Sequence, residues 1–289
     1  MAISIFDPSI ICIDEHSWVI EEERDSFLDN LLSSINILDE YKYSKLAWTY
    51  DIDDEIWSSP QTPPWRNDAV YSNTITPILY KKLPRIKEYI DCNQQEICLI
   101  TPPLYTPNVR IYNEIRKIIS STIDTNTVLF HAGPKNTPFS KFKIECGEYI
   151  PLTIPYIDSP SNYFKLINVE QHFWPKNHSD KNSLKMAIEI SWHAEFNYST
   201  PCPEFDMSDA FVKKLSQVRN DKKRILKTIT KRLSLSSQEA RLDGSLQEEL
   251  IDKEFRIRVS LEKRIHLIIK NKKITFMMFY DSGEHDDGL

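Results

Sequence analysis

Basic residues alternate with apolar residues in two short segments near the end of the chain. In EFRIRVS, Arg256 and Arg258 are separated by apolar residues, and in KRIHLII, Arg264 and His266 follow the same pattern. Arginine stays protonated and contacts phosphate oxygens through two N–H groups, whereas a histidine near its ordinary pKa of about 6.5 can transfer a proton. These residue types suit binding of RNA, and also its cleavage by attack of the 2′-hydroxyl, a reaction that requires no metal.

The spacing of two residues predicts β-strands that carry the basic side chains on one face and apolar side chains on the other. A three-residue loop pairs Arg258 with Arg264, and a four-residue loop pairs Ile269 with Ile274. A third strand completes the sheet. Its inward side chains are predicted to be Ile274, Phe276, Met278 and Tyr280.

One further strand and two helices are predicted before this sheet. The alternation in 185–196 predicts the strand, and the apolar spacing in 208–218 and 221–233 predicts two consecutive helices. We expect the helices to form a hairpin that packs on the apolar face of the antiparallel sheet. This is an α+β arrangement.

The order strand, helix, helix and three antiparallel strands resembles the RelE/ParE superfamily of small bacterial toxins over about residues 185–289. The stretch that carries the resemblance is EFRIRVSLEKRIHLIIKNKKITFMMFYDSGEHD. RelE-like members cleave mRNA, usually on the ribosome, whereas ParE-like members bind DNA gyrase and need no catalytic residues. The resemblance therefore implies a toxin-like bacterial protein, in a toxin–antitoxin or antiphage defence system.

The resemblance assigns RNA cleavage to one set of residues and RNA binding to another, and it implies no cofactor and no metal. The residues for cleavage are Arg258, Arg264 and His285. The residues for RNA binding are Arg256, Arg258, Lys263 and His266. The expected partners are RNA or the ribosome, together with a protein partner that is either an antitoxin or a subunit of a defence complex.

Two other functions remain open. The C-terminal region could be a non-enzymatic module, either a gyrase-type inhibitor or a scaffold subunit of a defence complex. Carboxylates at predicted strand ends in the first half could bind a divalent metal, as in PIN-like nucleases, or could simply cap the helices that follow. These carboxylates are Asp7, Asp14, Glu15, Asp51, Asp53, Asp54 and Glu55.

The first half of the chain alternates short apolar runs with segments of helical period, which predicts an α/β domain with parallel strands. The predicted domains are 1–168, of unknown role, and 185–289, with a boundary at 171–183. Strands are predicted at 3–6, 10–13, 45–50, 97–100 and 127–131, and helices at 19–38, 76–90 and 107–121.

Composition and charge narrow the class of protein further. Only five glycines occur, and neither the dinucleotide-binding G-x-G-x-x-G pattern nor a phosphate-binding loop is present. Residues 1–180 carry a net charge of −9 and residues 213–273 carry +10, which favours nucleic-acid binding by the second half. The scattered cysteines, the lack of a long apolar run and the absence of a secretory signal predict a cytoplasmic protein without a membrane partner.

Overall fold

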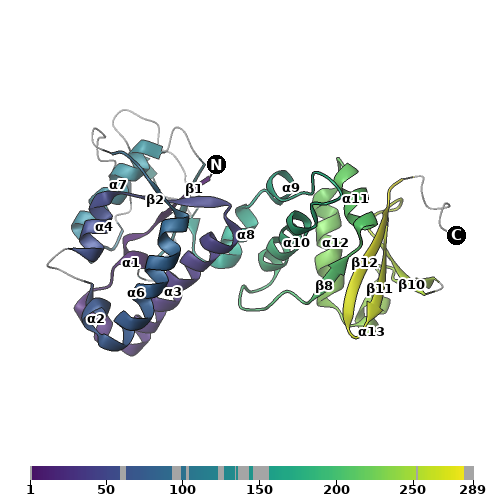
Figure 1. The fold of residues 1–289 in the computed structure, drawn as a ribbon, viewed down its shortest axis with the longest axis horizontal. Coiled ribbons are helices and arrows are strands. Elements are labelled where there is room, and N and C mark those ends of the chain that lie inside the picture. Colours follow the sequence, from purple (N-terminus) through teal and green to yellow (C-terminus); the bar gives the residue numbers. More distant parts are fainter. Residues whose placement is uncertain are drawn as a thin grey trace. The chain divides into compact units, whose positions relative to one another are not determined.

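The chain is a mixed α/β protein that divides into two compact units, Met1–Pro160 (unit 1) and Ser161–Leu289 (unit 2) (Figure 1). The structure is a computed structural model. It describes residues 2–58, 63–92, 99–101, 104–122, 127–133, 135, 143–145, 156–251 and 253–282. The predicted domain limits at 168 and 185 do not coincide with this division, and the resemblance to RelE/ParE toxins stays a prediction.

Unit 1 is built on a five-stranded sheet in the order β3-β2-β1-β5-β7, in which neighbouring strands are all parallel, as the sequence predicts. The strands are β1 (Ala2–Phe6), β2 (Ser44–Trp48), β3 (Lys87–Tyr89), β5 (Thr127–His131) and β7 (Tyr156–Ile157). A separate pair, β4 (Leu99–Thr101) and β6 (Lys143–Glu145), is antiparallel. Residues 97–98 of the strand predicted at 97–100 lie outside the described residues.

Helices cover the sheet of unit 1. The long helices α3 (Glu21–Tyr41) and α6 (Ala69–Ile86) pack against each other and against β2, whereas α7 (Val109–Thr122) packs on β1 and on α4 (Tyr50–Trp57). Since the chain reverses its direction across the sheet between β3 and β5, right-handed crossovers place α7 on the face opposite α3 and α6. The short helices are α1 (Pro8–Ile11), α2 (Glu15–Val19) and α5 (Pro64–Asn67).

The strand predicted at 10–13 is wrong, because Ile10 and Ile11 form the last two residues of helix α1 and the residues after them form no strand. The Asp7 carboxylate accepts a hydrogen bond from the Ser9 backbone at 2.8 Å, and Pro8 occupies the first turn, where its missing N–H is not needed. This local cap favours a helix. The apolar run does not distinguish a helix from a strand, because its side chains are buried in either.

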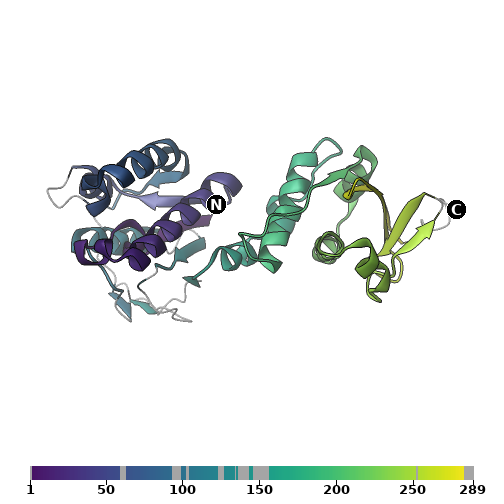
Figure 2. The same cartoon turned by 90° about the horizontal axis from the view of Figure 1, so that it is seen from below.

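Unit 2 packs three helices on one face of a five-stranded mixed sheet with the order β8-β12-β11-β10-β9 (Figures 1 and 2). β9 to β12 pair antiparallel, and β8 pairs parallel with β12. The strands are β8 (Phe205–Met207), β9 (Glu249–Ile251), β10 (Glu254–Arg258), β11 (Arg264–Lys270) and β12 (Lys273–Tyr280). The helices are α8 (Pro160–Leu166), α9 (Val169–His172), α10 (Lys181–Glu195), α11 (Asp209–Gln217), α12 (Lys222–Ser234) and α13 (Ser237–Leu242).

The strand predicted at 185–196 is also wrong, because this segment lies in α10. Ile188 and Trp192 lie on one side of this helix, in the core of unit 2, whereas Ile190 is buried on another side, because the helix has neighbours on more than one side. The strand that precedes the two predicted helices is β8. The segment 171–183, predicted as a boundary, contributes Trp174 to the core of unit 2, where its Nε1 donates to the Leu215 carbonyl.

The two predicted hairpin pairings are confirmed, since Arg258 lies opposite Arg264 and Ile269 lies opposite Ile274. A β-bulge follows His266 and shifts the register of β12 by one residue. As a result, Phe279 is buried. The prediction that Met278 and Tyr280 face inward is wrong, because the shift places both on the opposite face. The bulge thereby keeps the Tyr280 hydroxyl out of the apolar core.

Candidate nucleic-acid interface

One face of β10, β11 and the end of β12 carries the basic side chains that the sequence singles out. The helices of unit 2 pack on the other face of these strands, and no described helix covers this one (Figure 1). Its strands place the side chains in two rows, because each residue lies opposite a partner on the neighbouring strand. We call this surface the arginine face and define it by Arg256, Arg258, Arg264, His266 and Tyr280.

Two arginines face each other on this surface. Arg258 lies directly opposite Arg264, a like-charge pairing that normally destabilises a sheet. Burial lowers the pKa of Arg264, and the guanidinium groups of Arg258 and Arg256 lower it further. Arg264 donates to the carbonyls of Ser260 and Lys263, whereas the buried Nε of Arg258 has no acceptor among the described residues. Glu249 partly offsets this positive charge, but neither Arg258 nor Arg264 forms an ion pair with a described carboxylate.

The other two basic residues of the arginine face have carboxylate partners. Arg256 Nη2 lies 2.6 Å from Glu249 Oε2 in a solvent-exposed pair. His266 Nδ1 lies 3.2 Å from Glu254 Oε2, and its ring centroid is 4.6 Å from that of Tyr280. Burial lowers the pKa of His266 and the Glu254 hydrogen bond only partly offsets this, so the imidazole is neutral at pH 7.

Lys263, which the sequence predicts for RNA binding, is not part of this surface. Lys263 Nζ lies 2.8 Å from Asp221 Oδ2 and 3.3 Å from Asp281 Oδ1, and the hydrogen bond to Asp221 is the main reason that its pKa is raised. Lys263 therefore ties the loop before β11 to the start of α12. His285 lies outside the described residues.

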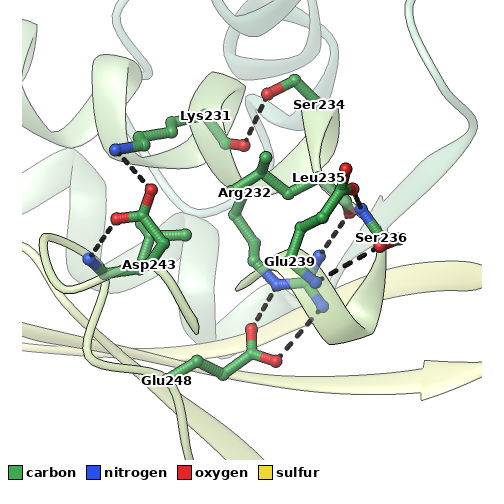
Figure 3. Close-up of polar contacts among 9 residues, drawn as sticks. Lys231, Arg232, Ser234, Leu235, Ser236, Glu239, Asp243 and Glu248 are labelled. Carbon is green, nitrogen blue, oxygen red and sulfur yellow. Dashed lines mark hydrogen bonds and ion pairs between the residues drawn. The ribbon is translucent and has the colours of Figure 1, made fainter. Parts of the chain in front are cut away.

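A buried ion pair supports the strands of the arginine face, and sequence reasoning missed it. The side chains of Arg232 and Glu248 are 1% and 0% exposed, and Arg232 Nε and Nη2 both donate to the Glu248 carboxylate (Figure 3). Arg232 Nη1 donates to the Leu235 carbonyl at 3.1 Å. The spacing held a signal, because Arg232 follows Ile225 and Ile229 on the apolar stripe of α12 and must point toward the core.

The turn before β9 is fixed by this pair and by a second contact from the same helix. Lys231 Nζ lies 2.7 Å from Asp243 Oδ2, and this hydrogen bond holds the pKa of Asp243 well below its usual range (Figure 3). The Leu246 carbonyl in this turn accepts a hydrogen bond from the Arg258 backbone N–H at 2.7 Å. Glu249, the residue after the buried Glu248, is the ion-pair partner of Arg256. The turn therefore sets the position of two arginines of the arginine face.

The carboxylates of unit 1 take part in separate contacts. Asp7 caps α1, Asp14 caps α2 and also accepts from the Tyr105 hydroxyl at 2.6 Å, and Asp53 accepts from side chains at the ends of β2 and β3. Glu55 accepts from the side chain of Arg110. Within the part of the chain that the structure describes, no three His, Cys, Asp or Glu side chains are grouped so that they could hold a metal ion.

A cavity of about 250 Å³ lies beside the carboxyl ends of β1 and β5, where the strand order of the sheet reverses. Such positions often hold ligands in α/β proteins. Asp14 lines it, and although burial opposes ionisation, hydrogen bonds from Tyr105 and Ser17 lower its pKa to about 2. Cys12 also lines it, but burial raises the pKa of this thiol to about 12, so it is a poor nucleophile.

No protein-family model and no curated protein sequence matches this chain. Among the described helices, none is long and apolar enough to cross a membrane. Cys12, Cys92 and Cys202 are free thiols. Function must therefore be inferred from the geometry of the chain itself, and the arginine face pairs two arginines that form no ion pair with a described carboxylate.

Proposed function

We propose that unit 2 binds RNA through the arginine face. The observation that carries this proposal is the pairing of Arg258 with Arg264, two arginines that form no ion pair with a described carboxylate. A phosphate group between the two guanidiniums would supply oxygen acceptors and relieve their mutual repulsion. The net charge of +10 in 213–273 adds a long-range field that attracts a polyanion.

The aromatic rings beside the arginines favour single-stranded RNA over a duplex. Tyr280 ends the row formed by Arg258 and Arg264, His266 lies beside it in the neighbouring row, and both rings are partly exposed. Unpaired bases stack on such rings, whereas bases inside a helix cannot reach them. The surface therefore offers phosphate contacts and base stacking within one short stretch of strand.

Fluorescence anisotropy with a short labelled single-stranded RNA tests this proposal. The affinity should fall steeply with salt, and Arg258→Gln should weaken binding roughly tenfold, the value of about one charge-assisted contact. Arg219→Gln removes the same charge from an exposed position outside the arginine face and should leave the affinity close to that of the unsubstituted protein. Equal affinities of the two variants would refute RNA binding at this surface.

Metal-independent RNA cleavage is a second candidate, and the hydrogen bond between His266 and Glu254 favours it. In this reaction the RNA 2′-hydroxyl attacks phosphorus, its proton passes to the neutral imidazole, and the bond to the 5′-oxygen breaks as that oxygen takes a proton from water. Incubation in chelator should release a 2′,3′-cyclic phosphate, and His266→Gln should abolish cleavage while RNA still binds. Binding without cleavage would favour a non-enzymatic module, such as a scaffold subunit of a defence complex.

The resemblance to RelE/ParE toxins supports a toxin-like role for the same surface in a bacterial cell. Induced expression should then slow growth, and the double variant Arg258→Gln/Arg264→Gln should relieve the effect at equal protein level. Growth arrest that persists in the double variant would separate toxicity from the arginine face. A normal growth rate with the unsubstituted protein would argue against the toxin-like role but not against RNA binding.

A further inference from the structure

A wide groove of about 790 Å³ lies within unit 2, between α12, the end of α10 and the segment formed by α8 and α9. Apolar side chains of the groove include Leu166, which is 39% exposed, and Val169, which is partly buried against the core. Leu226 lines it from α12. The groove exposes these apolar side chains beside polar and charged ones, and such a groove between helices suits an amphipathic helix.

The charged side chains of the groove form no ion pairs with other described residues. Lys223 and Lys227 line it from α12, and Lys165 lines it from α8. Glu170 and Glu195 line it from the ends of α9 and α10. Positive charge therefore dominates one wall, and no described carboxylate neutralises it.

The position of these lysines is unfavourable for α12 itself. Lys223 lies in the first turn, where the helix dipole disfavours a cation, and Lys227 repels it from one turn away. The side chain of Asp221, the N-cap residue, makes no capping hydrogen bond and instead pairs with Lys263 at 2.8 Å. The first turn of α12 therefore contains no acidic residue, and the Asp221 carboxylate does not accept hydrogen bonds from its backbone N–H groups.

We infer that the groove binds an amphipathic helix of a partner protein that carries acidic residues along one flank. The apolar side of that helix would cover Leu166 and Val169, and its acidic flank would face Lys223 and Lys227. Glu170 and Glu195 would repel a helix that is acidic on both flanks, which adds selectivity. The site shares no residue with the arginine face, so this inference does not depend on RNA binding.

The probe for the test is a synthetic labelled helical peptide with apolar residues at helical spacing, glutamate on one flank and glutamine on the other. Its binding to the full chain is measured by fluorescence anisotropy, beside a basic analogue in which lysine replaces every glutamate. The acidic peptide should bind, and Lys223→Glu/Lys227→Glu should weaken it at least tenfold. The same double variant should bind the basic analogue more tightly than the unsubstituted protein does, which requires a folded groove.

The matched control is Lys81→Glu/Lys213→Glu, which changes the net charge equally at two exposed positions outside the groove. This control should leave the affinity for the acidic peptide unchanged. Equal weakening in both double variants, or no binding of the acidic peptide up to about 1 mM, would overturn the inference. Displacement of the peptide by excess RNA would overturn it as well, because the groove would then belong to a nucleic-acid surface.

Discussion

Unit 2 contains two sites at which an arginine side chain has opposite electrostatic surroundings. Arg232 is 1% exposed, and its guanidinium meets a fully buried carboxylate and a backbone carbonyl. Arg258 is partly exposed on a strand face, directly opposite another arginine, and its buried Nε has no acceptor among the described residues. The Arg232 guanidinium therefore has its charge partner inside the fold. The Arg258 guanidinium has no ion-pair partner among the described residues, so it can bind an anion from solution.

This difference separates a structural arginine from a candidate functional one. A buried ion pair contributes little net stability, but removing one partner leaves a buried charge that is very unfavourable. A like-charge pair on a surface is unfavourable in the folded protein and becomes favourable only when an anion binds. Substitutions at the two sites should therefore change stability in opposite directions.

The largest effect is expected for Glu248→Ala, which leaves the Arg232 guanidinium buried with the Leu235 carbonyl as its remaining acceptor. The free energy of unfolding should fall by roughly 3–5 kcal/mol, measured by urea denaturation of the full chain. The double variant Arg232→Met/Glu248→Leu should recover most of this loss, because it removes both charges together.

Glu249→Ala is the matched control for this experiment, since Glu249 is the next residue and pairs with Arg256 in solvent. Exposed pairs contribute about 0–1 kcal/mol, so this variant should unfold almost as the unsubstituted protein does. If both alanine variants lose the same stability, the buried pair has no special role in holding the turn, and the contrast between the two arginine sites fails.

The next effect concerns pH and the affinity for RNA. His266 is neutral in the free protein because burial lowers its pKa, and Glu254 and Arg256 are the charged groups beside it. A nearby phosphate favours the protonated imidazole, so binding takes up a proton and the affinity should rise as the pH falls from 8 to 6. A solvent-exposed charge pair is worth at most about 1 kcal/mol, so the affinity should rise by no more than roughly fivefold.

Anisotropy titrations across this pH range provide the measurement. His266→Gln should flatten the pH dependence, whereas His178→Gln, at an exposed histidine outside the arginine face, should retain it. An unchanged pH dependence in His266→Gln would show that His266 does not face the bound RNA.

The sequence predicted the open face of the sheet better than the surroundings of that face. The alternation of Arg256 and Arg258 with apolar residues, together with loop length, was enough to pair Arg258 with Arg264. The alternation of inward and outward residues placed Tyr280 on the wrong face of the sheet. A β-bulge adds one residue to β12, and no turn signal in the sequence indicates it. Such irregularities depend on which side chains the core can accept, and that is a property of the whole sheet.

Two other features required contacts that are distant in sequence. The partner of Arg232 is Glu248, sixteen residues further along the chain, and only the packing of α12 against the turn before β9 brings them together. The alternation of Ile188 and Ile190 indicated a strand, but a helix enclosed by its neighbours buries both sides and loses its amphipathic pattern. Local patterns cannot report an environment that tertiary packing creates.

The smallest effect is the one that most sharply tests the contrast between the two arginine sites. Arg258→Gln removes one of two like charges that face each other across strands, and the neutral amide can still accept and donate hydrogen bonds. The free energy of unfolding should therefore rise by roughly 0.2–1 kcal/mol, and the gain should shrink in high salt, which already screens the repulsion. Arg256→Gln should show no gain, because Arg256 loses its pairing with Glu249. A loss of stability in Arg258→Gln would mean that Arg258, like Arg232, is held for the fold rather than kept for a ligand.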